Sequence, residues 1–392
     1  MSKLDELIAE LCPDGVDYLK LEDVATIDRG VRVVRNQLAK EDGYPVYQNS
    51  LTPLGYYEKS NCPENTPFVI SAGAAGEIGY SAVPFWAADD CLFILGGETI
   101  ENRYIYHALL WKQPHIYSRV RKASIPRLSR TVIEGLKIPV PPLEVQREIV
   151  CLLDNFTEQM EELQECLSKE LEARKKQIEH EKNKLLSFDD TVSYVRLDSY
   201  YPSIRNGFVG TVTKFFSDKE HGVRYLEGRN IHSGTISNDE EIFVTKEFHA
   251  QHLRTELQLE DIVMVQSGHV GECAVVGPDI AGANCHALII MSNAGECNSR
   301  FMMHYFYSEE GKKQLARITT GETVKHILAS AMQKFLVPSI SLEEQNRLVN
   351  ILDRLDESFI ELQKMLTNEI DARRKQYEYY RDKWLTFKEK VS

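Results

Sequence analysis

Two stretches decide how this chain is organised: LEVQREIVCLLDNFTEQMEELQECLSKELEARKKQIEHEKNKLLSF at Leu143–Phe188 and LEEQNRLVNILDRLDESFIELQKMLTNEIDARRKQYEYYRDKWLTF at Leu342–Phe387. They align without a gap, and about 20 of the 46 aligned positions are identical. Neither stretch contains Gly or Pro, so each is expected to form one uninterrupted helix. Similarity at a fixed separation is the signature of an internal repeat, and the chain is therefore a duplicated unit.

Apolar side chains recur along both stretches in alternating steps of three and four residues. This narrow stripe is typical of a coiled-coil seam, whereas a helix packed on a broad core carries a wider apolar face. A helix of this length would run about 65 Å, at ~1.5 Å per residue, and needs an equally long partner. The predicted helix-helix seam consists of Ile149, Leu153, Phe156, Met160, Leu163, Leu167, Leu348, Leu352, Leu355, Phe359, Leu362 and Leu366.

The regions that precede the two helices differ from them in composition and pattern, with Gly, aromatic and β-branched residues in short alternating runs. They predict mainly β domains with some helix. Each contains an apolar strand followed by a matching glycine loop, Gly73–Glu77 in the first and Gly268–Glu272 in the second, so the duplication covers both parts.

The predicted fold class is α+β: two mainly β domains joined by two long antiparallel coiled-coil helices, with a pseudo-two-fold internal repeat. The sequence around Leu7–Leu21 parallels that around Leu185–Leu197, which spans the end of the first long helix and the start of the second domain. The chain is therefore expected to begin with a segment that resembles the end of a long helix. The second long helix is then expected to return near the first domain. The predicted segments are a helix fragment at 1–17, domains at 18–142 and 194–341, and long helices at 143–188 and 342–388.

Composition narrows the class of protein. The 392 residues carry a formal net charge of -13, so any contact with DNA is expected to be confined to patches. Eight cysteines are scattered with no CxxC pair, which favours reduced packing residues over a zinc site or disulfides. No apolar run approaches the ~20 residues that span a bilayer, and the acidic start is unlike a signal peptide. A cytoplasmic location is expected. Because the repeat and the N-terminal helix fragment let one chain satisfy its own seam, the protein is expected to be a monomer.

The order of several short motifs carries a family resemblance. These motifs are Cys12-Pro-Asp-Gly-Val16, Gly43-Tyr-Pro-Val-Tyr-Gln-Asn49, Ile138-Pro-Val-Pro-Pro-Leu143 with Gln146, and Gly222-Val-Arg-Tyr-Leu226 with Gly228-Arg-Asn-Ile231. Together with the Arg/Lys-rich helix segments, and over essentially the whole chain, the sequence resembles specificity subunits of type I restriction-modification systems. One departure is the second domain's exit, Val337–Leu342, which lacks the double proline at Pro141-Pro142.

This resemblance implies a non-catalytic subunit with two target-recognition domains, each recognising one half of a split sequence in double-stranded DNA. It implies that the helices act as a ruler and as a dock for two modification subunits, which are adenine methyltransferases, with restriction subunits joining the larger complex. No cofactor is expected in this chain, and the partner methyltransferase is expected to use S-adenosylmethionine.

Phosphate contact is predicted for the segment 119–130, which places five cations in twelve residues without an acid. These cations are Arg119, Arg121, Lys122, Arg127 and Arg130. A solvated basic loop is the alternative. The second domain's counterpart is sparser and mixed with Glu322; it consists of Lys312, Lys313, Arg317, Lys325 and His326.

Base recognition requires side chains with paired donors and acceptors, which favours Arg, Asn and Gln on loops. Gln48 and Asn49 in the first domain, and Arg229 and Asn230 in the second, follow comparable short strands. Turn formation is the alternative role, because Asn readily satisfies nearby backbone groups. His269 in the second glycine loop could also reach DNA, although a tight hairpin turn is the preferred explanation of both glycine loops.

Catalytic signatures are absent: the sequence has no GxxxxGK[ST], HExxH or GxSxG motif, and no Asn/Asp-Pro-Pro-Tyr segment for amino methylation. His249 and His252 have a spacing compatible with a metal but lack further ligands, so surface histidines are expected and no metal site is predicted. Two other classes stay open: a coiled-coil adaptor, which the net acidity favours, and a self-sufficient nuclease or methyltransferase, which the missing motifs disfavour.

Overall fold

The computed structural model describes residues 2–390, and the chain divides into two compact units. The first unit contains the residues up to Ser168 and those from Leu366 onward, and the second contains Lys169–Met365. Each unit holds one globular domain together with the beginning of one long helix and the end of the other. Met1, which belongs to the predicted N-terminal fragment, lies outside the described residues.

The first domain is built on two small sheets. The four-stranded sheet has the order β2-β8-β5-β6, formed by Ala25–Arg29, Cys91–Gly96, Thr66–Ile70 and Ile78–Ser81. The three-stranded sheet has the order β4-β3-β7, formed by Tyr56–Tyr57, Tyr44–Tyr47 and Trp86–Ala87. A separate pair, β1 (Asp17–Lys20) with β9 (Lys137–Val140), brings the start of the domain beside its end. The helical segments are α1 (Lys3–Leu11), α2 (Leu21–Val24), the 3-10 turn Arg35–Gln37, α3 (Asn102–Ser118) and α4 (Arg130–Glu134).

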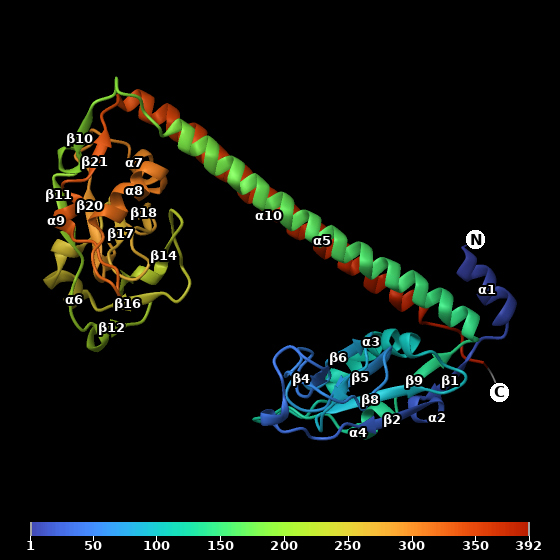
Figure 1. The fold of residues 1–392 in the computed structure, drawn as a ribbon. Coiled ribbons are helices and arrows are strands. Elements are labelled where there is room, and N and C mark those ends of the chain that lie inside the picture. The colour runs from blue at the N-terminus through green and yellow to red at the C-terminus, as the bar shows by residue number, and fades with distance from the viewer. Residues whose placement is uncertain (1, 391–392) are drawn as a thin grey trace. The chain divides into compact units, whose positions relative to one another are not determined.

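Strand β5 is buried along its whole length because both of its faces are covered. Val69 belongs to the core cluster that contains Tyr104 and Ile105 of α3, which packs against this sheet (Figure 1). Phe68 and Ile70 belong to a second cluster, with Ala87 of β7. Alternate side chains of a strand point to opposite faces, so one short apolar run contributes to two cores.

The second domain repeats this plan. Its sheets have the orders β11-β20-β17-β18 and β12-β16-β13-β19, and the pair β10-β21 corresponds to β1-β9. The strands are β10 (Tyr194–Arg196), β11 (Ser203–Asn206), β12 (Phe216–Ser217), β13 (Val223–Leu226), β14 (Ile231–His232), β15 (Thr235–Ile236), β16 (Ile242–Val244), β17 (Ile262–Val265), β18 (Cys273–Val275), β19 (Asn284–Cys285), β20 (Leu288–Ser292) and β21 (Leu336–Pro338). The α-helices are α6 (Lys246–Gln251), α7 (Ser299–Tyr307), α8 (Glu309–Ile318) and α9 (Ala329–Met332), and 3-10 turns occupy Leu197–Ser199, Thr213–Phe215, Gly228–Asn230 and Leu253–Thr255.

The long helices are α5 (Leu143–Leu185) and α10 (Leu342–Trp384), each of 43 residues. They end three and four residues before the predicted ends, at 188 and 388. In the first unit, the ring of Phe156 on α5 lies 5.7 Å from that of Tyr377 on α10. In the second unit, Lys182 near the end of α5 pairs with Asp356 near the beginning of α10. The beginning of each helix thus pairs with the end of the other, so the two helices run antiparallel, as the sequence predicted.

The C-terminal segment returns to the first domain. The amide of Val16 donates to Lys388 O at 2.9 Å, and the amide of Lys390 donates to Val16 O at 3.0 Å. Leu4 of α1 and Leu385 are both buried in the core of this unit. The expected return of the second helix is thus present. None of the helices among the described residues is both long and apolar enough to cross a membrane.

Candidate nucleic-acid interface

Three segments that are distant in sequence meet in the first domain. They are the loop 48–55 after β3, the glycine loop 71–77 between β5 and β6, and a hairpin at 121–127, and we call them the first loop cluster. Arg121 and Arg127 exchange backbone hydrogen bonds of 2.9 and 3.2 Å, which close the hairpin. The amide of Gly73 donates to Pro126 O at 3.2 Å, and that of Ala74 to Asn49 O at 2.9 Å.

The second domain assembles an equivalent second loop cluster from 227–241, 266–272 and the hairpin 320–326. Thr320 and His326 exchange the same pair of backbone bonds, at 2.9 and 2.8 Å. The hairpin joins the glycine loop through Ser267 Oγ, which lies 2.6 Å from His326 Nδ1. The loop 227–241 joins it where the amide of Ser233 donates to Glu272 at 2.6 Å. Two domains with diverged sequences thus keep the same convergence of loops.

A tyrosine-carboxylate bond supports each glycine loop. Tyr117 Oη donates to Glu77 at 2.8 Å in the first domain, and Tyr307 Oη donates to Glu272 at 3.0 Å in the second. Burial, aided by the bond to Glu77, raises the pKa of Tyr117 to about 12, and burial also raises the pKa of Tyr307. Both phenols therefore remain protonated donors at neutral pH, and the loops are held by hydrogen bonds rather than by charge.

Four of the five predicted cations in and beside the first hairpin are accessible and, among the residues that the structure describes, unpaired. Arg119, Arg121, Lys122 and Arg127 are all exposed, and within residues 2–390 the structure gives none of them an ion pair. Arg130 differs, because its Nε lies 2.6 Å from a Glu134 oxygen and its charge is compensated within α4. Four of the five predicted cations thus present uncompensated positive charge beside the loop cluster, which is the arrangement that phosphate contact requires.

Each hairpin carries an apolar side chain near its tip. Ile125 is 54% exposed and Val324, at the equivalent position, is 63% exposed. The sequence prediction placed the counterpart of the first hairpin at Lys312, Lys313, Arg317, Lys325 and His326. Only Lys325 and His326 lie in the second hairpin, and the other three lie on α8. The residues between the closing pairs, KASIP at 122–126 and GETVK at 321–325, have no identical aligned position. The only shared signal was the apolar residue two positions before the closing pair.

The base-recognition candidates of the second domain have partners within the protein. Arg229 Nε lies 2.9 Å from Glu227 and its Nη1 lies 2.7 Å from Glu240. Asn230 is only 2% exposed; its Oδ1 accepts from the Glu227 amide at 2.9 Å and its Nδ2 donates to Asp239 O. The structure thus corrects the expectation for Asn230, which has the turn-forming role that was the alternative. A buried side chain with both groups satisfied is not part of the DNA surface.

The other candidates lie at or near the surface. Gln48 is half-buried and donates to Asp89 at 3.3 Å, whereas Asn49 is exposed beside the first glycine loop. His269 is exposed in the second glycine loop. Lys312 and Lys313 are exposed on α8, where Lys313 lies 4.0 Å from Glu309. Their contact with DNA stays a prediction.

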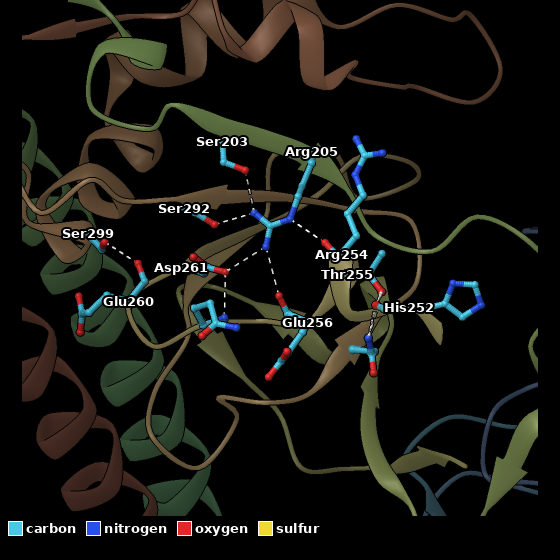
Figure 2. Close-up of polar contacts among 12 residues, drawn as sticks. Ser203, Arg205, His252, Arg254, Thr255, Glu256, Glu260, Asp261, Ser292 and Ser299 are labelled. Carbon is cyan, nitrogen blue, oxygen red and sulfur yellow. Dashed lines mark hydrogen bonds and ion pairs between the residues drawn. The ribbon is translucent and has the colours of Figure 1, made fainter. Parts of the chain in front are cut away.

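Figure 2 shows a cation of the second domain that serves the fold instead. Arg205 on β11 donates to Arg254 O at 2.8 Å, to Glu256 O at 3.2 Å and to Ser292 Oγ at 2.6 Å. It also lies 3.7 Å from Asp261, which is 2% exposed and whose pKa is raised by burial. Arg205 therefore fixes a loop to the sheet, and its charge is not available to phosphate.

The predicted seam residues lie on the inner sides of α5 and α10. Ile149, Leu153, Leu348 and Leu352 are buried, and the other predicted seam side chains are half-buried. Burial is greatest where the helix also meets a globular domain, because the domain core adds a second covering surface. Cys151 and Cys166 are exposed on α5, and the remaining cysteines are buried as thiols.

The two histidines considered for a metal are partly exposed and pack against neighbouring side chains. His249 Nδ1 lies 2.7 Å from Asn284 Oδ1, and the ring of His252 lies 4.4 Å from that of Phe248. Both are half-buried packing residues. Among residues 2–390, no group of three or more His, Cys, Asp or Glu side chains has the arrangement to hold a metal ion.

Comparison with known proteins agrees with this architecture. The family described as type I restriction modification DNA specificity domain matches twice, at residues 13–173 and 210–372. A putative type I restriction enzyme specificity subunit of Haemophilus influenzae is 25% identical over 386 residues, which are 95% of this chain and 96% of the relative. A putative type I specificity subunit of Mycoplasma pneumoniae is 24% identical over 382 residues, 93% of this chain and 96% of the relative.

The fold is also shared with a chain from a solved structure that concerns complex assembly and conformational transition of the type I restriction-modification system. The TM-score is 0.72 at 14% sequence identity, with 96% of this chain and 98% of the other covered. Because the family matches both halves of the repeat and most of the sequence, this chain belongs to the family of type I restriction-modification DNA specificity subunits.

Proposed function

We propose that this specificity subunit recognises a bipartite sequence in double-stranded DNA, with one loop cluster for each half. The observation that carries this proposal is the duplicated loop cluster, in which a strand-end loop, a glycine loop and a hairpin converge in both domains. The four uncompensated cations between 119 and 127 supply phosphate attraction in a protein whose net charge is -13. Direct base contacts from the loops would supply the sequence preference.

The two clusters are not electrostatically equal. The first hairpin contains Arg121, Lys122 and Arg127, whereas the second contains Glu322 beside Lys325 and closes on His326. Non-specific attraction would therefore come mainly from the first domain, and the second would depend more on contacts to bases. Different loop sequences on one scaffold also explain how the two halves of the target can differ.

The chain is proposed to perform no chemistry itself. It would bring DNA to two modification subunits, which would methylate adenine with S-adenosylmethionine, and restriction subunits would join the larger complex. The long helices α5 and α10 would dock the modification subunits and set the gap between the two half-sites. This assignment rests on the family to which the chain belongs and on the helices that link the two domains.

Adenine methylation in a host genome tests the proposal. The chain would be co-expressed with a candidate partner methyltransferase, and modified positions would be mapped by long-read sequencing. The expected result is a split motif that appears only when both proteins are present. Absence of methylation, together with no duplex binding by the purified complex, would instead favour a coiled-coil adaptor that ignores nucleic acid.

A further inference from the structure

The same three side chains join a globular domain to a long helix in both units. In the first unit, His107 Nε2 on α3 lies 2.7 Å from Asp154 Oδ1 on α5. Arg103, one turn earlier on α3, donates from Nε to both oxygens of Asp154 at 2.9 and 3.1 Å. Residues four apart share a helix face, so Arg103 and His107 approach one carboxylate together.

The second unit repeats this arrangement. His304 Nε2 on α7 lies 2.8 Å from Asp353 Oδ1 on α10, and Arg300 Nη2 lies 2.9 Å from the same oxygen. The Arg-x-x-x-His spacing is kept although the three intervening residues differ, YIY in one copy and FMM in the other. Asp353 is the aligned equivalent of Asp154 in the repeated helix.

A buried glutamine provides a second attachment about two helical turns earlier. Gln146 is fully buried; it accepts from the Glu101 amide at 3.0 Å and donates to Thr99 O at 2.8 Å. Gln345 is also fully buried and accepts from the Asn298 amide at 2.8 Å. Glutamine and aspartate are eight residues apart, which is about 12 Å along the helix. Two attachments at this separation fix the direction of the domain on its helix, whereas a single attachment would let the domain rotate about it.

The histidines are suited to a fixed contact. His107 is 1% exposed and His304 is 5% exposed. Burial lowers the pKa of both, so at neutral pH each imidazole is uncharged and donates one N–H to its aspartate. Arginine then supplies the single positive charge that balances the carboxylate. Such a charge-assisted, multiply bonded contact has a narrow geometry.

We propose that these Arg–His–Asp sets, here called the clamps, are positioning devices that fix the direction of each domain on its long helix. Their function would be to let both loop clusters engage one duplex at one gap length. This inference rests on the proposed bipartite recognition. Linking two weak binding events gains affinity only when geometry permits both together, so a loosened clamp would remove that gain without changing the bases recognised.

The positioning is tested first without DNA. Spin labels would be placed on native Cys151 of α5 and on Lys59→Cys in the first domain, with Cys166→Ser removing the other exposed cysteine. Pulsed electron paramagnetic resonance measures the distribution of distances between the labels. Asp154→Asn is expected to broaden this distribution. The matched control Arg174→Gln, which breaks an exposed ion pair within α5, is expected to leave it unchanged.

The consequence is tested with the assembled methyltransferase complex, on duplexes that carry one half-site or both. For single half-sites, the affinity of Asp154→Asn is expected to stay within about twofold of that of the original protein. For the bipartite duplex, its affinity is expected to fall by about tenfold or more, and the variant should tolerate more gap lengths. Asp353→Asn repeats the test in the second domain, in case one variant folds poorly. A purely stabilising role would instead lower single and bipartite affinities together.

The outcomes separate the two proposals. An unchanged distance distribution overturns the clamp, and so does a broadened distribution with unchanged bipartite affinity and gap preference. An equal effect of Arg174→Gln overturns it as well. If the original complex produces no split methylation motif, the proposed function fails, whereas the distance measurement still decides whether the clamps position the domains.

Discussion

Removal of the four uncompensated cations between 119 and 127 gives the sharpest prediction about DNA binding. The variant changes Arg119, Arg121, Lys122 and Arg127 to Gln, which keeps polar side chains of similar reach. Each cation that neutralises one phosphate contributes about 0.9 to the slope of log affinity against log salt. If all four cations contact phosphate, the slope flattens by about 3.6. The factor by which DNA affinity falls between 50 and 200 mM salt then becomes about 150-fold smaller.

Fluorescence anisotropy with a labelled duplex, measured with the assembled complex at several salt concentrations, gives these slopes. Arg130→Gln is the matched control, because Glu134 already compensates that charge and the slope should change by less than about 0.5. All five side chains are exposed, so thermal unfolding should change little. An unchanged slope in the fourfold variant, or an equal change in the control, would refute the phosphate assignment.

Three further predictions concern the fold and the helices. Arg205→Met removes the counter-charge of buried Asp261 and should cost about 3 kcal/mol in urea unfolding, whereas Arg229→Met, at an exposed ion pair, should cost under about 1 kcal/mol; equal costs would contradict the buried role. Burial lowers the folded-state pKa of His107 and His304. As the pH falls below about 6.5, the unfolded chain therefore takes up protons at these two residues before the folded chain does, and the free energy of unfolding should fall between pH 7 and 5.5. This fall should be smaller in the double variant His107→Gln/His304→Gln. One matched heptad inserted in both α5 and α10 adds about 10 Å, and the methylated motif should tolerate a gap changed by about three base pairs; an unchanged gap would exclude the ruler.

The repeat and the long helices were predictable because their signals are local. The three-four spacing from Ile149 to Leu167 and the absence of Gly and Pro are properties of neighbouring residues, and the alignment of the two copies needs no structure. The first helix was expected from 143 and begins at Leu143. Its end, at Leu185, came three residues earlier than predicted, and the next residue, Leu186, is buried in the core of the second unit. Tertiary packing rather than periodicity sets such a boundary.

Tertiary structure alone decided which polar side chains face solvent. Asn230 and Asn49 occupy similar places in the sequence, yet Asn230 is buried and satisfied whereas Asn49 is exposed. Five cations between 119 and 130 look equivalent as a string, and Arg130 differs because it begins the short helix α4, which was not predicted and which places Glu134 beside it. Burial and pairing depend on neighbours that the sequence alone does not place.

The sequence by itself determined the duplicated plan, the long helices and the class of protein, since these follow from periodicity and from the order of motifs. Only the tertiary structure showed the two loop clusters and the two clamps. The clamp residues His107 and Asp154 are 47 residues apart, and the bond between Gly73 and Pro126 spans a similar distance. Contacts of that separation are formed by strand pairing and helix packing, which one-dimensional patterns do not encode.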